Sequence, residues 1–316
     1  AVTYTGQSLI KFTKRVTNDF YNKELNDIEN YCIYIDTDSV FYSAMPLVIK
    51  RFPNINIYDE EKMSNTILNI ANEVQVYLNR SYDYFAKKFC NLDKHRFDIK
   101  QEVIAKSGLF VTKKRYGLKI INDNGKKVNK LMVKGLDTVR SSFPTAMREM
   151  LSKLLEDILM DVPKEKLDKF VINFKDSMKL MDFNKIAMPT SVKGIKKYRD
   201  NSGDIFHAYK LGTPIHVKSS LFYNDLLKYF NLTRKYSPIY NGEKIKWVYL
   251  KNNPIGLQTV AYKGYEDPPE ILSFIKQYIN HNKIYKQALH KKIMMLYESL
   301  GWSEPTDASK TIERFF

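Results

Sequence analysis

Residues 31–44, YCIYIDTDSVFYSA, place two runs of β-forming and aromatic residues on either side of a short polar tip. This pattern predicts two antiparallel strands joined by a tight turn. The tip carries two carboxylates, Asp36 and Asp38, separated by one residue. Like charges held this close repel each other, and a divalent cation beside them would stabilise the pair. The alternative is a solvated turn, in which Asp and Ser side chains bond to nearby backbone groups.

The sequence on either side of this hairpin predicts both helices and strands. Apolar residues at spacings of three and four predict amphipathic helices over residues 1–25 and 59–89. Strands are expected at residues 97–104, 109–111 and 116–121. Asp123-Asn124-Gly125 then supplies a hairpin turn. Because no initiator Met or helix N-cap precedes the first helix, we expect the chain to begin inside a larger structure.

Beyond residue 138 the periodicity becomes mostly helical, with a helix expected to begin at Ser142 and Pro144 near its first turn. We therefore expect an α+β protein with an antiparallel sheet and flanking helices over residues 1–132. A mainly α-helical domain is expected over residues 133–305, and a tail over residues 306–316. A length of 316 residues is enough for two domains with their own cores.

The composition excludes several classes of protein. A hydrophobic content of 44% with 22 Tyr and 18 Phe argues against disorder. Two Cys and five His are too few for a disulfide framework or a Cys/His zinc cluster, and they fit a reducing, intracellular compartment. No stretch approaches the ~18 apolar residues of a membrane span, and the first residues do not resemble a signal peptide. We expect a soluble protein with no membrane partner.

The formal charge of +16 is concentrated in two zones. Residues 105–135 carry +8 and residues 185–251 carry +9, so the rest of the chain sums to −1. Both zones interleave cations with aromatic residues and glycines, as in KKRYGLK at residues 113–119. This arrangement suits a nucleic-acid phosphate backbone. An RNA-binding structural protein would show the same charge, so charge alone does not separate it from a DNA-binding protein.

An ordered set of motifs resembles family B DNA polymerases. Tyr34-Ile35-Asp36-Thr37-Asp38-Ser39 resembles the family's Y-x-D-T-D-S hairpin, and Lys113-Lys114-Arg115-Tyr116 resembles its K-K-R-Y segment. Residues 134–142, KGLDTVRSS, are similar to the segment at the palm–thumb junction. Pro214-Ile215-His216-Val217 and Asn224 are similar to a thumb pattern. Order and spacing agree over essentially the whole chain, as in the replicative polymerases of T-even-type tailed bacteriophages.

The resemblance implies a palm domain over residues 1–132 followed by a thumb over residues 133–305. It implies catalysis by two Mg²⁺ ions, with Asp36 and Asp38 as catalytic and metal-binding residues. By this correspondence Asp38 binds both ions directly, whereas Asp36 acts partly through neighbouring groups. Glu102 falls where related polymerases carry an acidic residue facing the metal site, although an ordinary exposed carboxylate is an equal alternative.

DNA contacts are implied for a further set of residues. Lys113 and Lys114 match positions near the nascent base pair, and a helix beginning at Ser142 would add backbone N–H donors for phosphate. The full set is Lys113, Lys114, Arg115, Tyr116, Lys134, Arg140, Ser141 and Ser142.

Two motifs of the family do not occur in this chain. They are the D-x-x-S-L-Y-P-S strand with the third carboxylate and the K-x-x-x-N-S-x-Y-G helix of the fingers. Both lie upstream in the family, as does the exonuclease. We therefore expect a chain that is inactive alone and completes its Mg²⁺ site with an N-terminal polymerase part, acting on primer–template DNA and dNTPs in the cytoplasm of an infected bacterium. The alternative is a non-catalytic DNA-binding or processivity subunit.

The last residues, SKTIERFF at 309–316, resemble a sliding-clamp-binding peptide. Ile312, Phe315 and Phe316 have the spacing of one helical face and would anchor the peptide in an apolar pocket of the clamp. The Gln usual in such peptides is replaced by Ser309. The alternative is a tail that packs on its own thumb.

Overall fold

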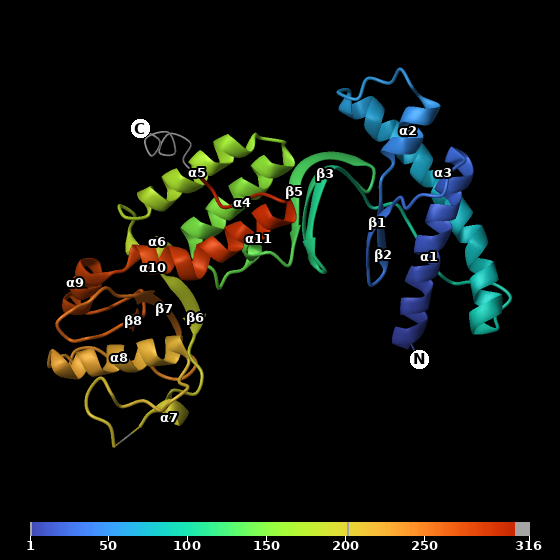
Figure 1. The fold of residues 1–316 in the computed structure, drawn as a ribbon. Coiled ribbons are helices and arrows are strands. Elements are labelled where there is room, and N and C mark those ends of the chain that lie inside the picture. Colours follow the sequence, from blue (N-terminus) through green and yellow to red (C-terminus); the bar gives the residue numbers. More distant parts are fainter. Residues whose placement is uncertain (1, 201, 307–316) are drawn as a thin grey trace. The chain divides into compact units, whose positions relative to one another are not determined.

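The computed structural model describes residues 2–200 and 202–306. The chain divides between Lys134 and Gly135 into two compact units, whose elements are labelled in Figure 1. Helices alternate with small antiparallel sheets, which confirms the expected α+β class. Each unit has its own packed interior and is described by itself.

The first unit contains three helices and two sheets. Its elements are α1 (Val2–Leu25), β1 (Cys32–Asp36), β2 (Ser39–Tyr42), α2 (Met45–Arg51), α3 (Glu60–Cys90), β3 (Val103–Thr112), β4 (Arg115–Asp123) and β5 (Lys126–Lys134). Apolar residues at helical spacing, such as Phe12, Val16 and Phe20, pack α1 into a core with α3. Both expected helices are therefore confirmed, and the Asp59 side chain caps α3 by accepting from the Lys62 N–H at 3.0 Å.

The sheet β3-β4-β5 differs in part from the expectation. Residues 97–102 are not a strand, because Phe97 and Ile99 pack instead against the core of α1 and α3. The polar residues around Gly108 do not interrupt β3, which runs from Val103 to Thr112. A Cβ atom at Gly108 would lie 2.7 Å from Leu118 Cδ2, so glycine leaves room for the Leu118 side chain. The turn at Asn124 and Gly125, both with positive φ, is confirmed.

The second unit begins at Gly135. Its elements are η1 (Asp137–Val139), α4 (Thr145–Leu159), α5 (Lys164–Ser177), α6 (Phe183–Ile186), β6 (Met188–Ser191), α7 (Ile195–Tyr198), α8 (Ile215–Tyr229), β7 (Lys244–Tyr249), β8 (Thr259–Tyr262), α9 (Pro269–Tyr278), α10 (His281–Ile284), η2 (Tyr285–His290) and α11 (Lys291–Ser299). Helices predominate, but β6, β7 and β8 form a three-stranded antiparallel sheet that α8 covers. The sequence did not predict this sheet, since its strands are short and β6 lies far from β7 along the chain.

The start of α4 also differs from the expectation. The helix begins at Thr145, with Pro144 as its N-cap residue, rather than at Ser142. A residue that precedes proline is pushed towards extended backbone, so Phe143 cannot continue a helix from Ser142 into α4. Ser141 and Ser142 therefore lie in an exposed turn and offer no helix N-terminus.

Within the part of the chain that the structure describes, no helix is both long and apolar enough to cross a lipid bilayer.

Candidate active-site hairpin and cationic turn

The tip of the β1–β2 hairpin holds its two carboxylates in a rigid turn. Asp36 pairs with Ser39 across the ladder, and Thr37 at the turn has a φ of 52°. Thr37 Oγ1 donates to Asp36 Oδ1 at 3.1 Å, and Ser39 Oγ donates to the Asp36 carbonyl at 3.1 Å. A β-branched residue in the left-handed region costs roughly 1–3 kcal/mol, and such strain concentrates at functional sites.

The two carboxylates have different surroundings. Because Tyr34 pairs with Phe41 and Asp36 with Ser39, these side chains share one face of the hairpin. The Asp36 side chain is 21% exposed and faces the sheet of the first unit, whereas Asp38 is exposed at the tip. Asp38 is therefore the carboxylate that is more open to a ligand from solvent.

The KKRY segment forms the turn between β3 and β4 and lies against this hairpin. Lys114 has a φ of 62°, and its backbone N–H donates to the Tyr34 hydroxyl at 2.7 Å. The Lys114 ammonium lies 3.7 Å from Asp36 Oδ1. The structure therefore brings together the two motifs that the sequence singled out, although Tyr34 and Lys114 are 80 residues apart.

An aromatic cluster holds the hairpin against the sheet. Tyr34 lies 5.2 Å from Phe110 and 5.7 Å from Tyr116 between ring centroids, and Phe41 lies 5.6 Å from both. Burial, together with the nearby Asp36 carboxylate and Tyr34, raises the pKa of the Tyr116 phenol. Tyr116 is therefore a neutral, buried side chain that supports the hairpin. A side chain that contacts DNA would have to be exposed.

The opposite face of the hairpin is fixed to the helices. Tyr21 of α1 lies 5.1 Å from the Tyr31 ring and 5.6 Å from the Tyr42 ring. The Asn18 side-chain oxygen accepts from the backbone N–H groups of Tyr31 and Cys32, at 2.9 and 3.0 Å. Asn18 therefore anchors the start of β1 to α1, a role that no sequence motif indicated.

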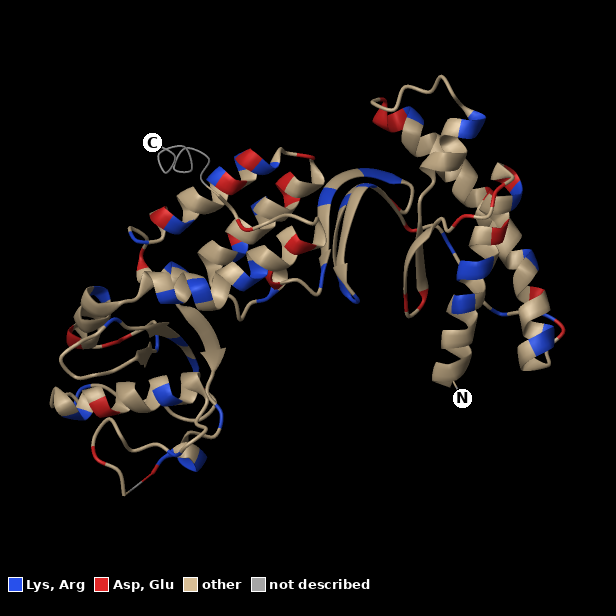
Figure 2. Ribbon diagram, viewed as in Figure 1, with Lys and Arg blue, Asp and Glu red and all other residues tan. Residues whose placement is uncertain are grey.

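Several cations gather at the same end of the sheet. Lys134 at the end of β5 pairs in register with Tyr116, and its side chain is exposed, as are those of Lys113 and Lys114. Arg115 is half-buried. Figure 2 shows the acidic hairpin tip and the Lys and Arg residues distributed along β3, β4 and β5. The arrangement places the exposed Lys114 ammonium 3.7 Å from the partly buried Asp36 carboxylate.

Glu102 lies elsewhere. It precedes β3, is exposed, and its carbonyl accepts from the Asn124 N–H, at the end of the sheet opposite the Lys113–Lys114 turn. With β3 spanning ten residues at ~3.4 Å each, the two ends are about 30 Å apart. Within the first unit, Glu102 is therefore remote from Asp36 and Asp38, which favours the reading of Glu102 as an ordinary exposed carboxylate.

The junction segment of the second unit contains a buried carboxylate between two cations. Asp137 Oδ1 lies 3.3 Å from an Arg140 guanidinium nitrogen, and its Oδ2 lies 2.9 Å from the Lys292 ammonium. The Asp137 side chain is 9% exposed, whereas that of Arg140 is 50% exposed. Arg140 is thus held at the surface by a fixed anion. Neither Asp137 nor Lys292 was singled out from the sequence.

The PIHV…N pattern has a structural role in the second unit. Pro214 is the N-cap residue of α8, and burial lowers the pKa of the His216 imidazole. The Asn224 amide donates to the Ile239 carbonyl at 3.0 Å and accepts from the Ile239 N–H at 2.7 Å. Asn224 therefore fastens the loop before β7 to α8.

The sequence predicts a Mg²⁺ site at two carboxylates, Asp36 and Asp38. Among residues 2–200 and 202–306, no group of three or more His, Cys, Asp and Glu side chains is arranged to hold a metal. Asp36 and Asp38 are hard oxygen donors near an exposed turn, which fits Mg²⁺, an ion that commonly binds through one or two carboxylates plus water and phosphate.

The expected clamp-binding residues Ile312, Phe315 and Phe316 lie outside the described residues.

A strained hairpin turn with two carboxylates thus packs against a turn that carries exposed lysines. The family model for DNA polymerase family B matches residues 1–300, so this chain belongs to DNA polymerase family B. It is 26% identical to the DNA-directed DNA polymerase of Enterobacteria phage T4, over 98% of this chain, and 25% identical to that of Escherichia phage RB69, over all of it. The chain spans about a third of these relatives, 35% of each.

Proposed function

We propose that this chain is the palm and thumb part of a replicative DNA-directed DNA polymerase. Residues 1–132 would form the palm part and residues 133–305 the thumb. The observation that carries the proposal is the contact between the DTDS hairpin and the KKRY turn, made by Lys114 with Tyr34 at 2.7 Å and with Asp36 at 3.7 Å. Carboxylates can hold the metal ions of nucleotidyl transfer, and cations beside them can bind the phosphate backbone of DNA.

In this proposal Asp36 and Asp38 hold Mg²⁺. When bound, two Mg²⁺ ions would activate the primer 3′-hydroxyl and neutralise the charge that develops on the triphosphate. Lys114 orients Asp36 and presents its exposed ammonium to the DNA. The other proposed DNA contacts are Lys113, Arg115, Lys134, Arg140, Ser141 and Ser142, the two serines through their hydroxyls. Tyr116, which is 6% exposed, supports the turn instead of contacting DNA itself.

The proposed partner is an N-terminal polymerase part with the exonuclease, the third carboxylate and the fingers. Two observations support it. The chain spans 35% of its phage relatives, and β1 and β2 form a two-stranded sheet of their own. The outer edges of a two-stranded sheet carry backbone N–H and C=O groups that are ready to accept another strand. Ile33 on β1 is 58% exposed, which adds apolar surface for such a partner.

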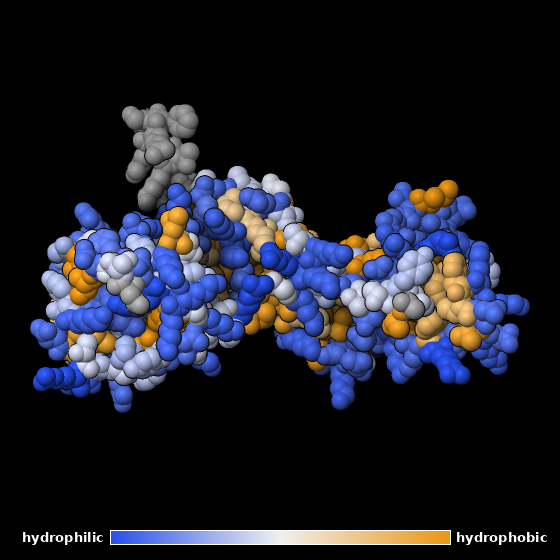
Figure 3. All heavy atoms as spheres, turned by 90° about the horizontal axis from the view of Figure 1, so that it is seen from below, coloured by the Kyte–Doolittle hydropathy of each residue, from blue (hydrophilic) through white to orange (hydrophobic). Residues whose placement is uncertain are grey.

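Several apolar side chains are exposed on the first unit. Figure 3 shows small apolar patches among mostly hydrophilic residues on the face drawn there. The exposed apolar residues of the first unit include Ile28, Ile33, Phe52, Tyr58 and Phe89.

We further propose that the tail, through Ile312, Phe315 and Phe316, binds a sliding clamp, and that the protein works in the cytoplasm of an infected bacterium.

Primer extension tests the proposal. The chain, an N-terminal exonuclease–fingers part, and their mixture are each incubated with primed DNA, dNTPs and Mg²⁺. We expect extension only in the mixture, and its loss by at least a hundredfold with Asp38→Ala. Asp19→Ala is the matched control, because Asp19 is an exposed carboxylate on α1.

Two outcomes would contradict the proposal. Extension by the mixture that is unaffected by Asp38→Ala would make the chain a DNA-holding subunit without catalytic carboxylates. Extension by this chain alone would remove the need for an N-terminal partner.

A further inference from the structure

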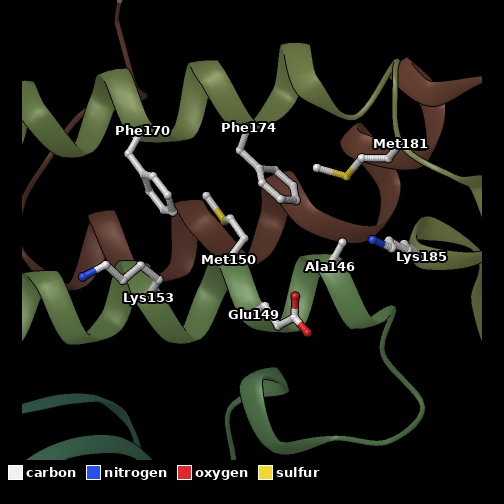
Figure 4. Close-up of a pocket in the computed structure, with 8 residues that line it drawn as sticks. All are labelled: Ala146, Glu149, Met150, Lys153, Phe170, Phe174, Met181 and Lys185. Atoms are coloured by element: carbon white, nitrogen blue, oxygen red, sulfur yellow. The ribbon is translucent and has the colours of Figure 1, made fainter.

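An apolar groove lies between α4, α5 and α6 of the second unit (Figure 4). Its volume is about 340 Å³, within the range of roughly 300–1,000 Å³ that is usual for ligand pockets. Five apolar side chains line it: Ala146, Met150, Phe170, Phe174 and Met181. Figure 4 shows the Phe170 and Phe174 rings pointing from α5 towards Met150 of α4.

The groove is suited to a peptide with aromatic anchors. Methionine side chains are flexible and polarisable, so they adapt to an inserted ring and make favourable sulfur–aromatic contacts. Three charged residues lie along the groove, Glu149, Lys153 and Lys185. A matching ligand would carry apolar or aromatic residues with at least one charge of each sign beside them.

The last five residues of the chain, IERFF at 312–316, have this composition. Ile312, Phe315 and Phe316 are the apolar anchors, and Glu313 and Arg314 between them carry one charge of each sign. Glu313 can pair with a lysine of the groove, and Arg314 can pair with Glu149.

The described chain ends against α5, the helix that also lines the groove. The Thr306 N–H donates to Asp168 Oδ2 of α5 at 3.3 Å, and Asp168 is itself held by Lys164 at 2.6 Å and the Tyr297 hydroxyl at 2.9 Å. Two contacts hold the segment just before Thr306. His290 Nε2 lies 2.9 Å from Glu304 Oε1, and the Tyr297 and Trp302 rings pack edge to face. The described chain therefore ends at a defined position beside α5.

The remaining residues are long enough to reach the groove. Phe170 and Phe174 lie on α5, as Asp168 does, but they project from the opposite side of the helix. To reach them from Asp168, the chain must pass half-way around α5. With a helix diameter of ~11 Å, this path is about 17 Å. Six residues in extended conformation span about 20 Å, which brings residue 312 to the groove.

We propose that residues 312–316 dock into the groove between α4, α5 and α6 of their own chain. The groove is then an intramolecular binding site for the tail. Any external protein that binds Ile312, Phe315 and Phe316 must compete with the groove. The proposal concerns a contact within the chain, so it does not depend on polymerase activity.

Methionine methyl NMR tests the docking. The full 316-residue chain, labelled with [¹³Cε]methionine, is compared with a chain that ends at Thr306. We expect the Met150 and Met181 methyl signals, assigned with Met150→Leu and Met181→Leu, to shift on truncation. The signal of Met160, which is 49% exposed and does not line the groove, should stay unchanged.

Three further samples complete the test. The triple variant Ile312→Ala, Phe315→Ala, Phe316→Ala should reproduce the truncated spectrum, whereas the matched variant Lys310→Ala should not. A synthetic peptide of residues 303–316 should restore the signals of the truncated chain only at about millimolar concentration, since tethering supplies an effective concentration of that order. Identical Met150 and Met181 signals in the full and truncated chains would overturn the proposal. A shift that grows with protein concentration would also overturn it, because the occupant would then be the tail of a second copy.

Discussion

At the residue scale, two side chains decide how the DTDS carboxylates are presented. Tyr34 shares a face with Asp36 and fixes the backbone of Lys114, while Thr37 accepts a left-handed conformation that turns the chain between Asp36 and Asp38. The ammonium of Lys114 then lies 3.7 Å from Asp36. The Asp36 carboxylate is therefore positioned by neighbouring side chains that carry no metal-binding group.

Tyr34→Phe tests the link between the hairpin and the cationic turn. The change removes the hydroxyl that accepts from the Lys114 N–H but keeps the ring within the aromatic cluster. We expect the free energy of unfolding to fall by only about 1 kcal/mol. Primer extension by the reconstituted pair should fall about tenfold, because small displacements of positioned groups are costly in rate. Tyr4→Phe, at an exposed tyrosine of α1, is the control, and an equal rate for Tyr34→Phe and the control would contradict the proposed link.

Thiol reactivity provides a second test at this scale. Burial raises the pKa of the Cys32 thiol to about 11, and Cys32 is 4% exposed at the base of β1, whereas Cys90 is more exposed. At pH 8 only a small fraction of Cys32 is therefore in the reactive thiolate form, and this fraction rises as the pH approaches 11. At pH 8 we expect iodoacetamide to label Cys90 at least tenfold faster than Cys32, as measured by mass spectrometry of peptides. Equal rates for the two thiols would show that β1 is not held against α1.

At the element scale, the positions of short segments depend on side chains that bind backbone groups. Asn18 fastens β1 to α1, and Asn224 fastens the loop before β7 to α8. Hairpins and loops of this length have little intrinsic stability, so these amide contacts set where they lie. The Asn224 position of the family pattern thus reflects the architecture of the second unit.

Asn224→Ala tests that role. The change leaves the Ile239 N–H and carbonyl without partners in a partly buried position. We expect the free energy of unfolding of the second unit to fall by roughly 2–3 kcal/mol. Asn173→Ala, at an exposed position of α5, should change it by less than about 0.5 kcal/mol. Urea denaturation followed by circular dichroism measures both values, and similar midpoints for the two variants would refute the structural role.

At the scale of the whole molecule, the +16 charge matters through its distribution. In the first unit, cations occupy both ends of the β3-β4-β5 sheet, but only one end adjoins Asp36 and Asp38. If the proposed function holds, the cations at that end neutralise DNA phosphates, and those at the Asn124–Gly125 end do not.

Salt dependence of DNA binding distinguishes the two ends. Each phosphate contact adds about 0.9 to the slope of log affinity against log salt concentration. We expect Lys113→Gln to reduce the slope for primer–template DNA by about this amount. Lys126→Gln, at an exposed lysine that begins β5 at the opposite end of the sheet, should leave it unchanged. Fluorescence anisotropy between 50 and 300 mM NaCl measures the slopes, and equal losses for both variants would indicate non-specific binding over the whole sheet.

The sequence by itself determined the elements whose signals are local. The periodicity of α1 and α3, the strand–turn–strand pattern around Asp36 and Asp38, and the Asn124–Gly125 turn each arise from contacts between residues close along the chain. The motifs that placed the chain in the polymerase family are local in the same sense. Each motif lies on one short piece of the chain: a hairpin, a turn or a single helix.

Only the tertiary structure decided which of these elements meet. The sheet β6-β7-β8, the start of α4 and the loss of residues 97–102 from β3 all depend on packing against distant segments. The same is true of the contact between Tyr34 and Lys114, and of Asp137 with Lys292. A hydrogen bond or ion pair between residues far apart in the chain leaves no periodic signal, because its geometry exists only once the elements have packed.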